Sequence, residues 1–169
     1  MIRMADSSDA TDLVAIYNHY VAGTIITFEE ESIQPEEMAR RIADVRTISL
    51  PWLVAEECNQ VVGYAYATPW KTRSAYRFSV EVTVYVAQGK AGRGIGSLLY
   101  SGLFSILQTR GIHSVIGGIA LPNDKSVALH EKFGLKKVAH FHQVGFKFNR
   151  WVDVGYWERI FPQTAAPTP

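Results

Sequence analysis

The sequence predicts a single α/β domain in which helices flank one mixed sheet. Strand-like and helix-like runs of apolar residues follow one another along the 169 residues, with no linker or internal repeat between them. A glycine-dense turn joins the central strand pattern to an amphipathic helix pattern. The domain is expected to span 1–161, and the segment 162–169, rich in Pro, Thr and Ala, is expected to be a frayed tail.

The first part of the chain predicts a short strand at 2–4 and then two helices. Ser7, Ser8 and Asp9 are N-cap candidates for the first helix. The apolar face of this helix carries Leu13, Ile16, Tyr17, Tyr20 and Val21. Pro35 suits the first position of the second helix, where its missing N–H costs no hydrogen bond. The inward face of the second helix carries Met38, Ile42 and Val45.

The remaining pattern predicts six strands and two helices. Asn59 marks a turn between the first two of these strands, which are therefore expected to form a hairpin. The expected strands are 52–56, 61–68, 76–87, 114–120, 135–148 and 152–161, and the expected helices are 94–110 and about 124–133. On the central strand, 76–87, the even-numbered apolar residues share one face and Glu81 lies on the other.

Composition indicates a compact enzyme and argues against several partners. Apolar residues at 47% and aromatic residues at 12% exclude a disordered chain. A net charge of +1 gives no electrostatic case for nucleic acid or an acidic membrane. The single Cys58 allows no internal disulfide, and no signal peptide or membrane-length apolar run is visible, so a cytoplasmic location is expected. Histidines and carboxylates are not expected to cluster, so no metal is expected.

The turn before the helix at 94–110 is the strongest functional signal. Gly92, Gly94 and Gly96 have no Cβ, so backbone N–H groups there can converge on a ligand. The helix that follows adds unpaired N–H donors and the positive end of its dipole. Lys90 and Arg93 add positive charge. The turn predicts a site for a phosphate-bearing ligand, and the alternative is a glycine-rich loop that only turns the chain.

The spacing of this turn excludes two familiar phosphate sites. A P-loop needs Lys and Ser/Thr after its last glycine, and a dinucleotide fingerprint counted from Gly92 needs glycine where Ser97 stands. The turn resembles the Q/R-x-x-G-x-G/A pyrophosphate turn of the GCN5-related N-acetyltransferases, which maps onto Ala91, Gly92, Arg93, Gly94, Ile95 and Gly96. Ala91 departs from the family, so Lys90 or Arg93 is expected to supply the missing charge. The resemblance implies acetyl-CoA as the ligand, held between Lys90 and Ser97.

Five further segments narrow the resemblance to the phosphinothricin and methionine sulfoximine/sulfone N-acetyltransferases. They are 70–76, 80–86, 121–126, 130–135, and 144–147 with 151–157. The resemblance implies a mostly antiparallel sheet whose central strands splay to receive acetyl-CoA, direct transfer in a ternary complex, and a homodimer. The apolar closing strands, 141–161, are the expected subunit interface, although core packing also accounts for their aromatic residues.

Glu81 is the candidate catalytic base. A carboxylate in the middle of an apolar, β-branched strand is costly unless it lines a wet or functional cleft. An amine must lose its proton before it attacks a thioester, and Glu81 can accept that proton directly or through water. The alternatives are an exposed position on an open sheet face and a pair with a nearby arginine.

The resemblance implies a second catalytic residue, His130, as acid to the departing thiolate or base to the amine. Asn123 and Ser126, at the start of the same helix, are implied to contact the pantetheine arm, although Asn123 is also a good N-cap. The pantetheine amides are implied to pair with the main chain of Val84, Tyr85 and Val86.

Arg73 is the first candidate for the acceptor's carboxylate or phosphinate, because a guanidinium binds such groups through two parallel hydrogen bonds. The loop that carries Arg73 also holds the candidate Lys71. The resemblance adds Phe28 and Glu29 on a second acceptor-side loop. Phe28 and Trp70 are candidate pocket walls, although aromatic residues more often belong to the core.

The predicted activity is transfer of the acetyl group of acetyl-CoA to the α-amino group of phosphinothricin, methionine sulfoximine or methionine sulfone. The alternatives are an acetyltransferase for a polyamine, an aminoglycoside or a peptide N-terminus, and a non-catalytic acyl-CoA-binding sensor. A polyamine site should present acidic residues rather than an arginine-bearing loop. A sensor has no need of Glu81 and His130 together.

Overall fold

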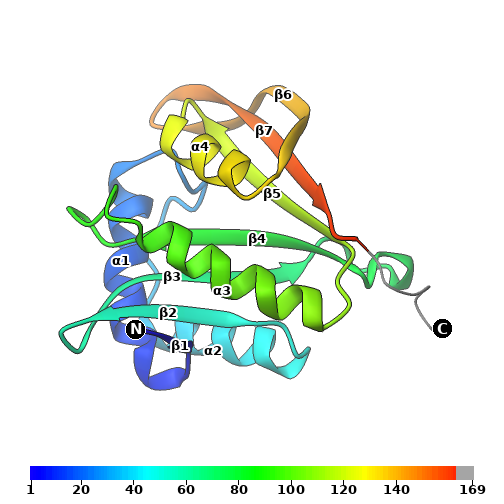
Figure 1. The fold of residues 1–169 in the computed structure, drawn as a ribbon. Coiled ribbons are helices and arrows are strands. Elements are labelled where there is room, and N and C mark those ends of the chain that lie inside the picture. Colours follow the sequence, from blue (N-terminus) through cyan, green and yellow to red (C-terminus); the bar gives the residue numbers. More distant parts are fainter. Residues whose placement is uncertain (163–169) are drawn as a thin grey trace.

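A computed structural model describes residues 1–162 and contains every strand and helix that the sequence predicts (Figure 1). The strands are β1 (Ile2–Met4), β2 (Trp52–Glu57), β3 (Gln60–Pro69), β4 (Ser79–Val86), β5 (Ser114–Leu121), β6 (Lys136–Lys147) and β7 (Arg150–Ile160). The helices are α1 (Ala10–Gly23), α2 (Pro35–Thr47), α3 (Ile95–Thr109) and α4 (Asp124–Lys132). From residue 163 onward, the expected tail lies outside the described residues.

The strands form one seven-stranded sheet in the order β1-β2-β3-β4-β5-β7-β6. All neighbouring strands are antiparallel except β4 and β5, which are parallel. The expected hairpin is β2–β3, and Asn59 in its turn has a φ of 61°. The prediction of a mixed, mostly antiparallel sheet is therefore confirmed.

The core lies in two layers, one on each face of the sheet (Figure 1). On one face, Leu99 and Leu103 of α3 pack with Val80 and Val82 of β4. On the other, α1 and α2 pack on the sheet through Leu13, Val21, Met38, Ile42, Val54 and Tyr85. The alternation predicted for β4 is therefore confirmed. Burying each of these large apolar side chains stabilises the fold by about 1.5–3 kcal/mol.

Two local expectations are wrong. Ser7, Ser8 and Asp9 form a 3₁₀ turn, in which the Asp6 carboxylate accepts the Ser8 N–H at 2.8 Å; Asp9 holds the N-cap position of α1, but no side chain makes the expected capping hydrogen bond. The Asp9 carboxylate is engaged by the Arg3 guanidinium, with the closest N–O distance 2.6 Å, so it gives α1 no cap. The central strand begins at Ser79 rather than at 76, because Ser74–Tyr76 form a second 3₁₀ turn.

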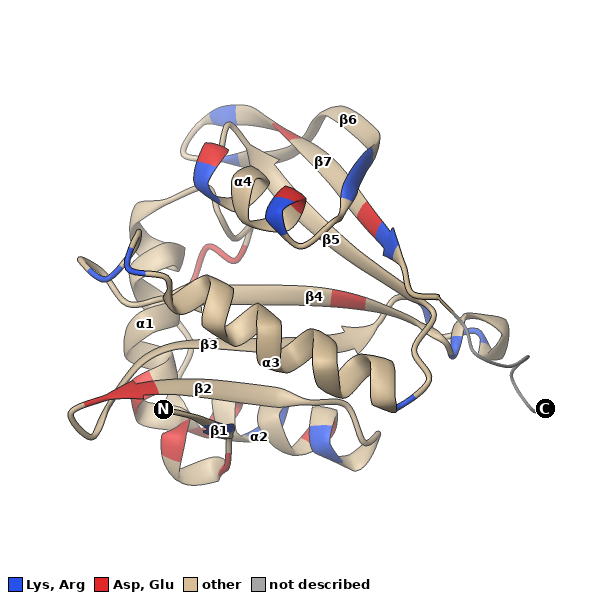
Figure 2. Cartoon of the chain, in the orientation of Figure 1, with Lys and Arg blue, Asp and Glu red and all other residues tan. Residues whose placement is uncertain are grey.

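Charge is distributed unevenly around β4. Lys and Arg segments lie in the turn before α3 and in the loop between β3 and β4, at the two ends of β4, whereas α3 carries no charged residue (Figure 2). Within residues 1–162, no helix is both long enough and apolar enough to cross a membrane.

Candidate active site

Strands β4 and β5 are paired over only part of their length. Their parallel pairs run from Ser79 with Ser114 to Glu81 with Ile116. Beyond these pairs the two ribbons run at an angle to each other in Figure 1. The edge of a strand without a paired neighbour presents N–H and C=O groups that an extended ligand can meet. The last part of β4 is therefore a place where an extended ligand can lie.

Two adjacent glycines of β5 face the two candidate catalytic side chains. A Cβ at Gly117 would strike the imidazole of His130, and a Cβ at Gly118 would lie 3.0 Å from Oε1 of Glu81. Successive residues of a strand point to opposite faces of a sheet. Glu81 and His130 therefore lie on opposite faces, and the missing side chains of the two glycines leave room for them.

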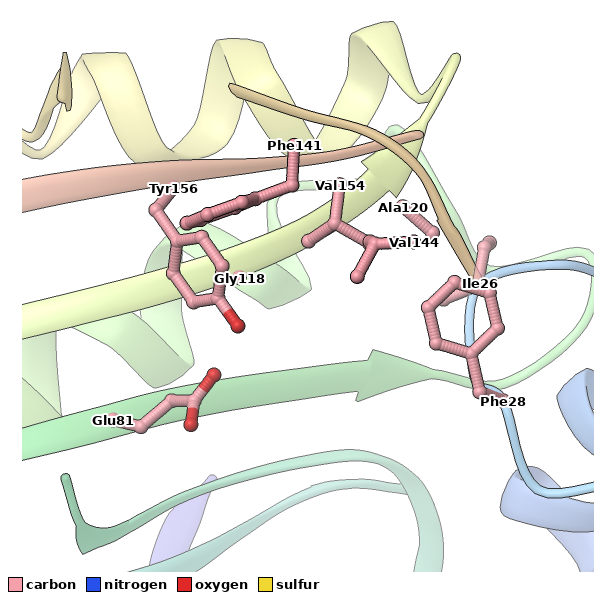
Figure 3. A pocket seen from close by; sticks show the side chains of 9 residues that line it. All are labelled: Ile26, Phe28, Glu81, Gly118, Ala120, Phe141, Val144, Val154 and Tyr156. Atoms are coloured by element: carbon pink, nitrogen blue, oxygen red, sulfur yellow. The ribbon is translucent and has the colours of Figure 1, made fainter. Parts of the chain in front are cut away.

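Glu81 lines a cavity of about 440 Å³, a volume typical of small-molecule sites. The walls come from β4, β5, β6, β7 and the loop after α1 (Figure 3). The residues are Ile26, Phe28, Glu81, Gly118, Ala120, Phe141, Val144, Val154 and Tyr156. In Figure 3 the Glu81 carboxylate and the Tyr156 hydroxyl point toward each other, and the other labelled side chains are apolar. The cavity thus presents one carboxylate and one phenol to a ligand.

The surroundings of Glu81 suit a base. Burial raises the pKa of Glu81 above its usual value, and the positive charge of Lys71 opposes this rise. Burial and the nearby Glu81 also raise the pKa of Tyr156, which keeps the phenol protonated. A carboxylate with a raised pKa accepts a proton more readily than an exposed glutamate. Because Glu81 is partly buried in the cavity wall, the exposed position considered from the sequence is excluded.

His130 is buried between α4 and α3, with only 3% of its surface exposed. Nδ1 lies 2.7 Å from the Ser126 carbonyl oxygen, which can only accept, so Nδ1 carries the ring proton. Nε2 therefore accepts a hydrogen bond from the Tyr100 hydroxyl at 3.0 Å. Burial lowers the pKa of His130, so the ring is neutral. Both nitrogens are engaged by protein atoms, and His130 does not line the Glu81 cavity.

The glycine turn has the geometry of an anion site. Gly92 and Gly94 both have a φ of 82°, and nothing lies within 4 Å of where their Cβ atoms would be. Gly94 is the N-cap of α3 and supplies no side-chain hydrogen bond, so the first N–H groups of the helix are not capped by a side chain. Gly96 differs, because a Cβ there would lie 3.0 Å from Leu129 of α4. Because Gly96 has no Cβ, α4 can pack closely on α3.

Three cations lie around this turn. Lys90 Nζ is 3.0 Å and Arg93 Nη1 is 3.5 Å from the carboxylate of Glu57. Lys132, on α4, donates to the Ser97 hydroxyl at 2.9 Å. Sequence reasoning identified Lys90 and Arg93 but missed Lys132, which lies far from the turn along the chain and comes close only through helix packing.

The candidate pantetheine contacts have partners within the protein. The Asn123 side chain accepts the Ser126 N–H at 3.2 Å, so Asn123 caps α4 as its residue type predicts. The Val86 carbonyl accepts the Tyr20 hydroxyl at 2.5 Å. Val84 pairs with Ala65 on the β3 side of β4.

The loop after α1 carries two candidate acceptor-site residues, Phe28 and Glu29, and only one of them reaches the cavity. Phe28 lines the cavity, and its ring packs against Gly145 of β6, where a Cβ would strike it. The Glu29 carboxylate does not line the cavity, since it forms an ion pair with Arg41 of α2 at 2.8 Å. The structure thus brings Phe28 to the site and directs Glu29 to α2.

The loop between β3 and β4 lies beside the cavity without lining it. The Lys71 ammonium lies 4.5 Å from the Trp70 ring centroid, and the Trp70 ring meets Tyr156 edge-on at 5.5 Å. Arg73 is exposed on the same loop. Trp70 therefore supports a wall of the cavity through Tyr156, while Arg73 and Lys71 supply positive charge from the neighbouring loop.

Sequence reasoning missed a buried lysine that holds the loop after α1. Lys147, at the end of β6, is only 2% exposed. Its ammonium donates to the backbone carbonyls of Val21 at 2.7 Å, Thr27 at 2.8 Å and Glu29 at 2.8 Å. Burial lowers the pKa of Lys147. The only sequence signal is a charged residue in an aromatic strand, which equally predicts an exposed side chain.

The expectation that histidines and carboxylates do not cluster is wrong. Ligand atoms of His140, His142 and Asp153 all lie within 4.8 Å of one another on β6 and β7. The spacing along the chain conceals this group, because strand pairing brings Asp153 back beside the two histidines.

Comparison with known proteins identifies the family of the chain. The family model described as an acetyltransferase (GNAT) domain matches residues 2–155. The phosphinothricin N-acetyltransferase of Streptomyces coelicolor is 41% identical over 94% of this chain and 94% of its own length. The L-methionine sulfoximine/L-methionine sulfone acetyltransferase of Salmonella typhimurium is 32% identical over 98% of this chain and 97% of its own.

A solved structure of a GNAT superfamily protein has the same fold. The fold matches that of a GNAT superfamily phosphinothricin acetyltransferase from Sinorhizobium meliloti in complex with acetyl-CoA, with a TM-score of 0.94 and 32% identity. The match covers 100% of this chain and 92% of that one.

Proposed function

The chain belongs to the GNAT acetyltransferase family, and from this premise we propose that it acetylates the α-amino group of a glutamate-like amino acid. Phosphinothricin, methionine sulfoximine and methionine sulfone are the acceptors, and acetyl-CoA is the donor. The observation that carries the proposal is the partly buried carboxylate of Glu81 in a cavity of small-molecule size. A binding sensor has no need of such a base.

The reaction follows from the position of Glu81. Glu81 accepts a proton from the acceptor ammonium, directly or through one water, and the neutral amine then attacks the thioester carbonyl. The new C–N bond forms as the C–S bond breaks, and the thiolate leaves with its electron pair. We propose His130 as the proton donor to this thiolate; because the ring proton is on Nδ1, this role requires the hydrogen bond from Nδ1 to the Ser126 carbonyl to open.

Acetyl-CoA is proposed to bind along the edge of β4 and the turn before α3. The main chain of 84–86 suits an extended pantetheine arm, and the arm is expected to pass Asn123 and Ser126. The open space at Gly92 and Gly94 and the uncapped start of α3 suit a pyrophosphate. The cations around this turn supply the charge that Ala91 does not.

We propose a homodimer formed through β6 and β7. Strand β6 is an edge of the sheet, and the two strands expose large apolar side chains. These are Val138, Phe141, Val144, Phe146 and Trp151, each at least half exposed. Large apolar side chains exposed on adjacent strands are typical of a protein interface. Sedimentation velocity should return the mass of two chains, and a monomer at micromolar concentration would contradict the dimer.

Arg73 tests the proposed acceptor. Replacing Arg73 with Ala should raise the KM for methionine sulfoximine about tenfold or more, because a hydrogen bond between charged groups contributes about 1.5–3 kcal/mol. The KM for acetyl-CoA should stay unchanged. Arg77→Ala is the matched control, since it removes an equal charge from the same loop. A change confined to the acetyl-CoA KM would remove Arg73 from the acceptor site.

A further inference from the structure

We propose that His140, His142 and Asp153 form a binding site for a divalent transition-metal ion such as Zn²⁺. The site lies on β6 and β7, and alternation along both strands places it behind the cavity wall. Phe141 and Val154, the neighbours of these residues, point into the cavity (Figure 3). The proposal does not depend on which acceptor the cavity takes.

The three side chains are already gathered. Oδ2 of Asp153 lies 2.7 Å from Nε2 of His140 and 3.1 Å from Nδ1 of His142. The two imidazole rings are stacked, with centroids 4.3 Å apart and an interplanar angle of 24°. Ligand atoms about 2.0–2.2 Å from a zinc ion stand about 3 Å from one another, so small side-chain movements would complete the site.

A bulge in β6 creates this arrangement. Phe141 pairs with Val154 and Gly145 pairs with Val152, so three residues of β6, 142–144, face the single Asp153. The Gln143 N–H donates to Oδ1 of Asp153 at 2.8 Å and leaves Oδ2 to the histidines. A ligand carboxylate held in this way by a backbone donor is a common support of metal sites.

The donor set selects the class of ion. Two imidazole nitrogens and one carboxylate oxygen suit Zn²⁺ and its transition-metal neighbours, whereas Mg²⁺ and Ca²⁺ prefer oxygen ligands alone. In the single chain all three side chains are partly or fully exposed, so an ion can reach them from solvent and keep water at its remaining positions. The alternative is a hydrogen-bonded cluster that only stabilises the bulge.

Lys137 allows the two explanations to be separated. Its ammonium lies 3.1 Å from Nδ1 of His140 and can only donate, so the His140 proton is on Nε2 and points at Asp153. A metal ion takes the place of that proton, and the charge of Lys137 then opposes binding. Removing this charge should therefore strengthen metal binding, although it removes a hydrogen bond from the cluster.

Calorimetric titration of the tag-free protein with Zn²⁺ tests the proposal. The wild type should bind one Zn²⁺ per chain, Mg²⁺ should not bind, and Lys137→Met should bind Zn²⁺ several-fold more tightly. His142→Ala should weaken binding at least tenfold. The variant should fold as the wild type does, because the His142 side chain is 78% exposed. His19→Ala, at an exposed position of α1, is the matched control and should bind as the wild type does. Absence of Zn²⁺ binding in the wild type, or equal binding by His142→Ala, would overturn the site.

Discussion

Replacing Glu81 with Gln should lower kcat for amine acetylation by about 100- to 10,000-fold, the range for a positioned general base. The amide has nearly the shape of the carboxylate, so it fits the space beside Gly118 and Tyr156 without a new cavity. It cannot accept the proton of the acceptor ammonium. The KM for acetyl-CoA should not change, because the proposed cofactor site lies along other residues of β4 and the turn before α3.

The pH dependence should identify the same group. A base acts only when ionised, so kcat/KM of the wild type should fall as the pH drops through the pKa of Glu81. Because burial raises that pKa, the fall should begin at a higher pH than for an exposed glutamate. Glu81→Gln should lose this acidic limb.

The control for this prediction is Glu31→Gln, an exposed glutamate in the same loop as Phe28, which should behave as the wild type. The measurement is initial-rate thiol release across acidic to alkaline pH for the three proteins. If Glu81→Gln kept the wild-type rate and pH profile, Glu81 would not be the base.

Replacing Lys147 with Met should lower the free energy of unfolding by about 3 kcal/mol or more. The ammonium satisfies the carbonyls of Val21, Thr27 and Glu29, and each carbonyl left without a donor costs about 1–3 kcal/mol. Met has a similar length, so the loss reports the hydrogen bonds more than a cavity. Urea denaturation measures the change.

The same substitution should also weaken acceptor binding. Lys147 fixes the loop that carries Phe28, and Phe28 is a wall of the cavity. The acceptor KM should rise while the acetyl-CoA KM stays constant. Lys136→Met, on the same strand but exposed, is the matched control for both measurements. A loss of stability below about 1 kcal/mol would mean that water replaces the ammonium at these carbonyls.

The elements of the fold were predictable because their signals are local. The predicted helices 94–110 and about 124–133 lie within one residue of the bounds of α3 and α4, and Pro35 marks the start of α2. The errors occur where two local patterns compete. Ser7 and Ser8 suit a helix cap and a 3₁₀ turn equally, and the hydrogen bonds of Asp6 and the pairing of Asp9 with Arg3 favour the turn.

The candidate site was predictable only where one residue is anomalous within its own segment. Glu81 breaks an apolar strand, and the alternating glycines interrupt a strand-to-helix junction, so both are visible from the sequence. That Glu81 and His130 occupy opposite faces was not visible, because it depends on how β5 passes between them at Gly117 and Gly118.

The residues that were missed depend on contacts between distant segments. Lys147 is separated from the loop it holds by more than a hundred residues, and Lys132 reaches Ser97 only when α4 packs on α3. The cluster around Asp153 requires a bulge that changes the register of β6 by two residues between Phe141 and Gly145. Register and bulges are set by pairing, which no single segment encodes.

The most direct test of the account is the initial rate of thiol release from acetyl-CoA with a panel of acceptors. The panel is phosphinothricin, methionine sulfoximine and methionine sulfone, set against spermidine, an aminoglycoside and a short peptide. The account predicts saturable turnover with the first three and little with the others. Turnover confined to spermidine, the aminoglycoside or the peptide would contradict the proposed acceptor, and tight acetyl-CoA binding without turnover on any of the six would contradict the catalytic role of the Glu81 cavity.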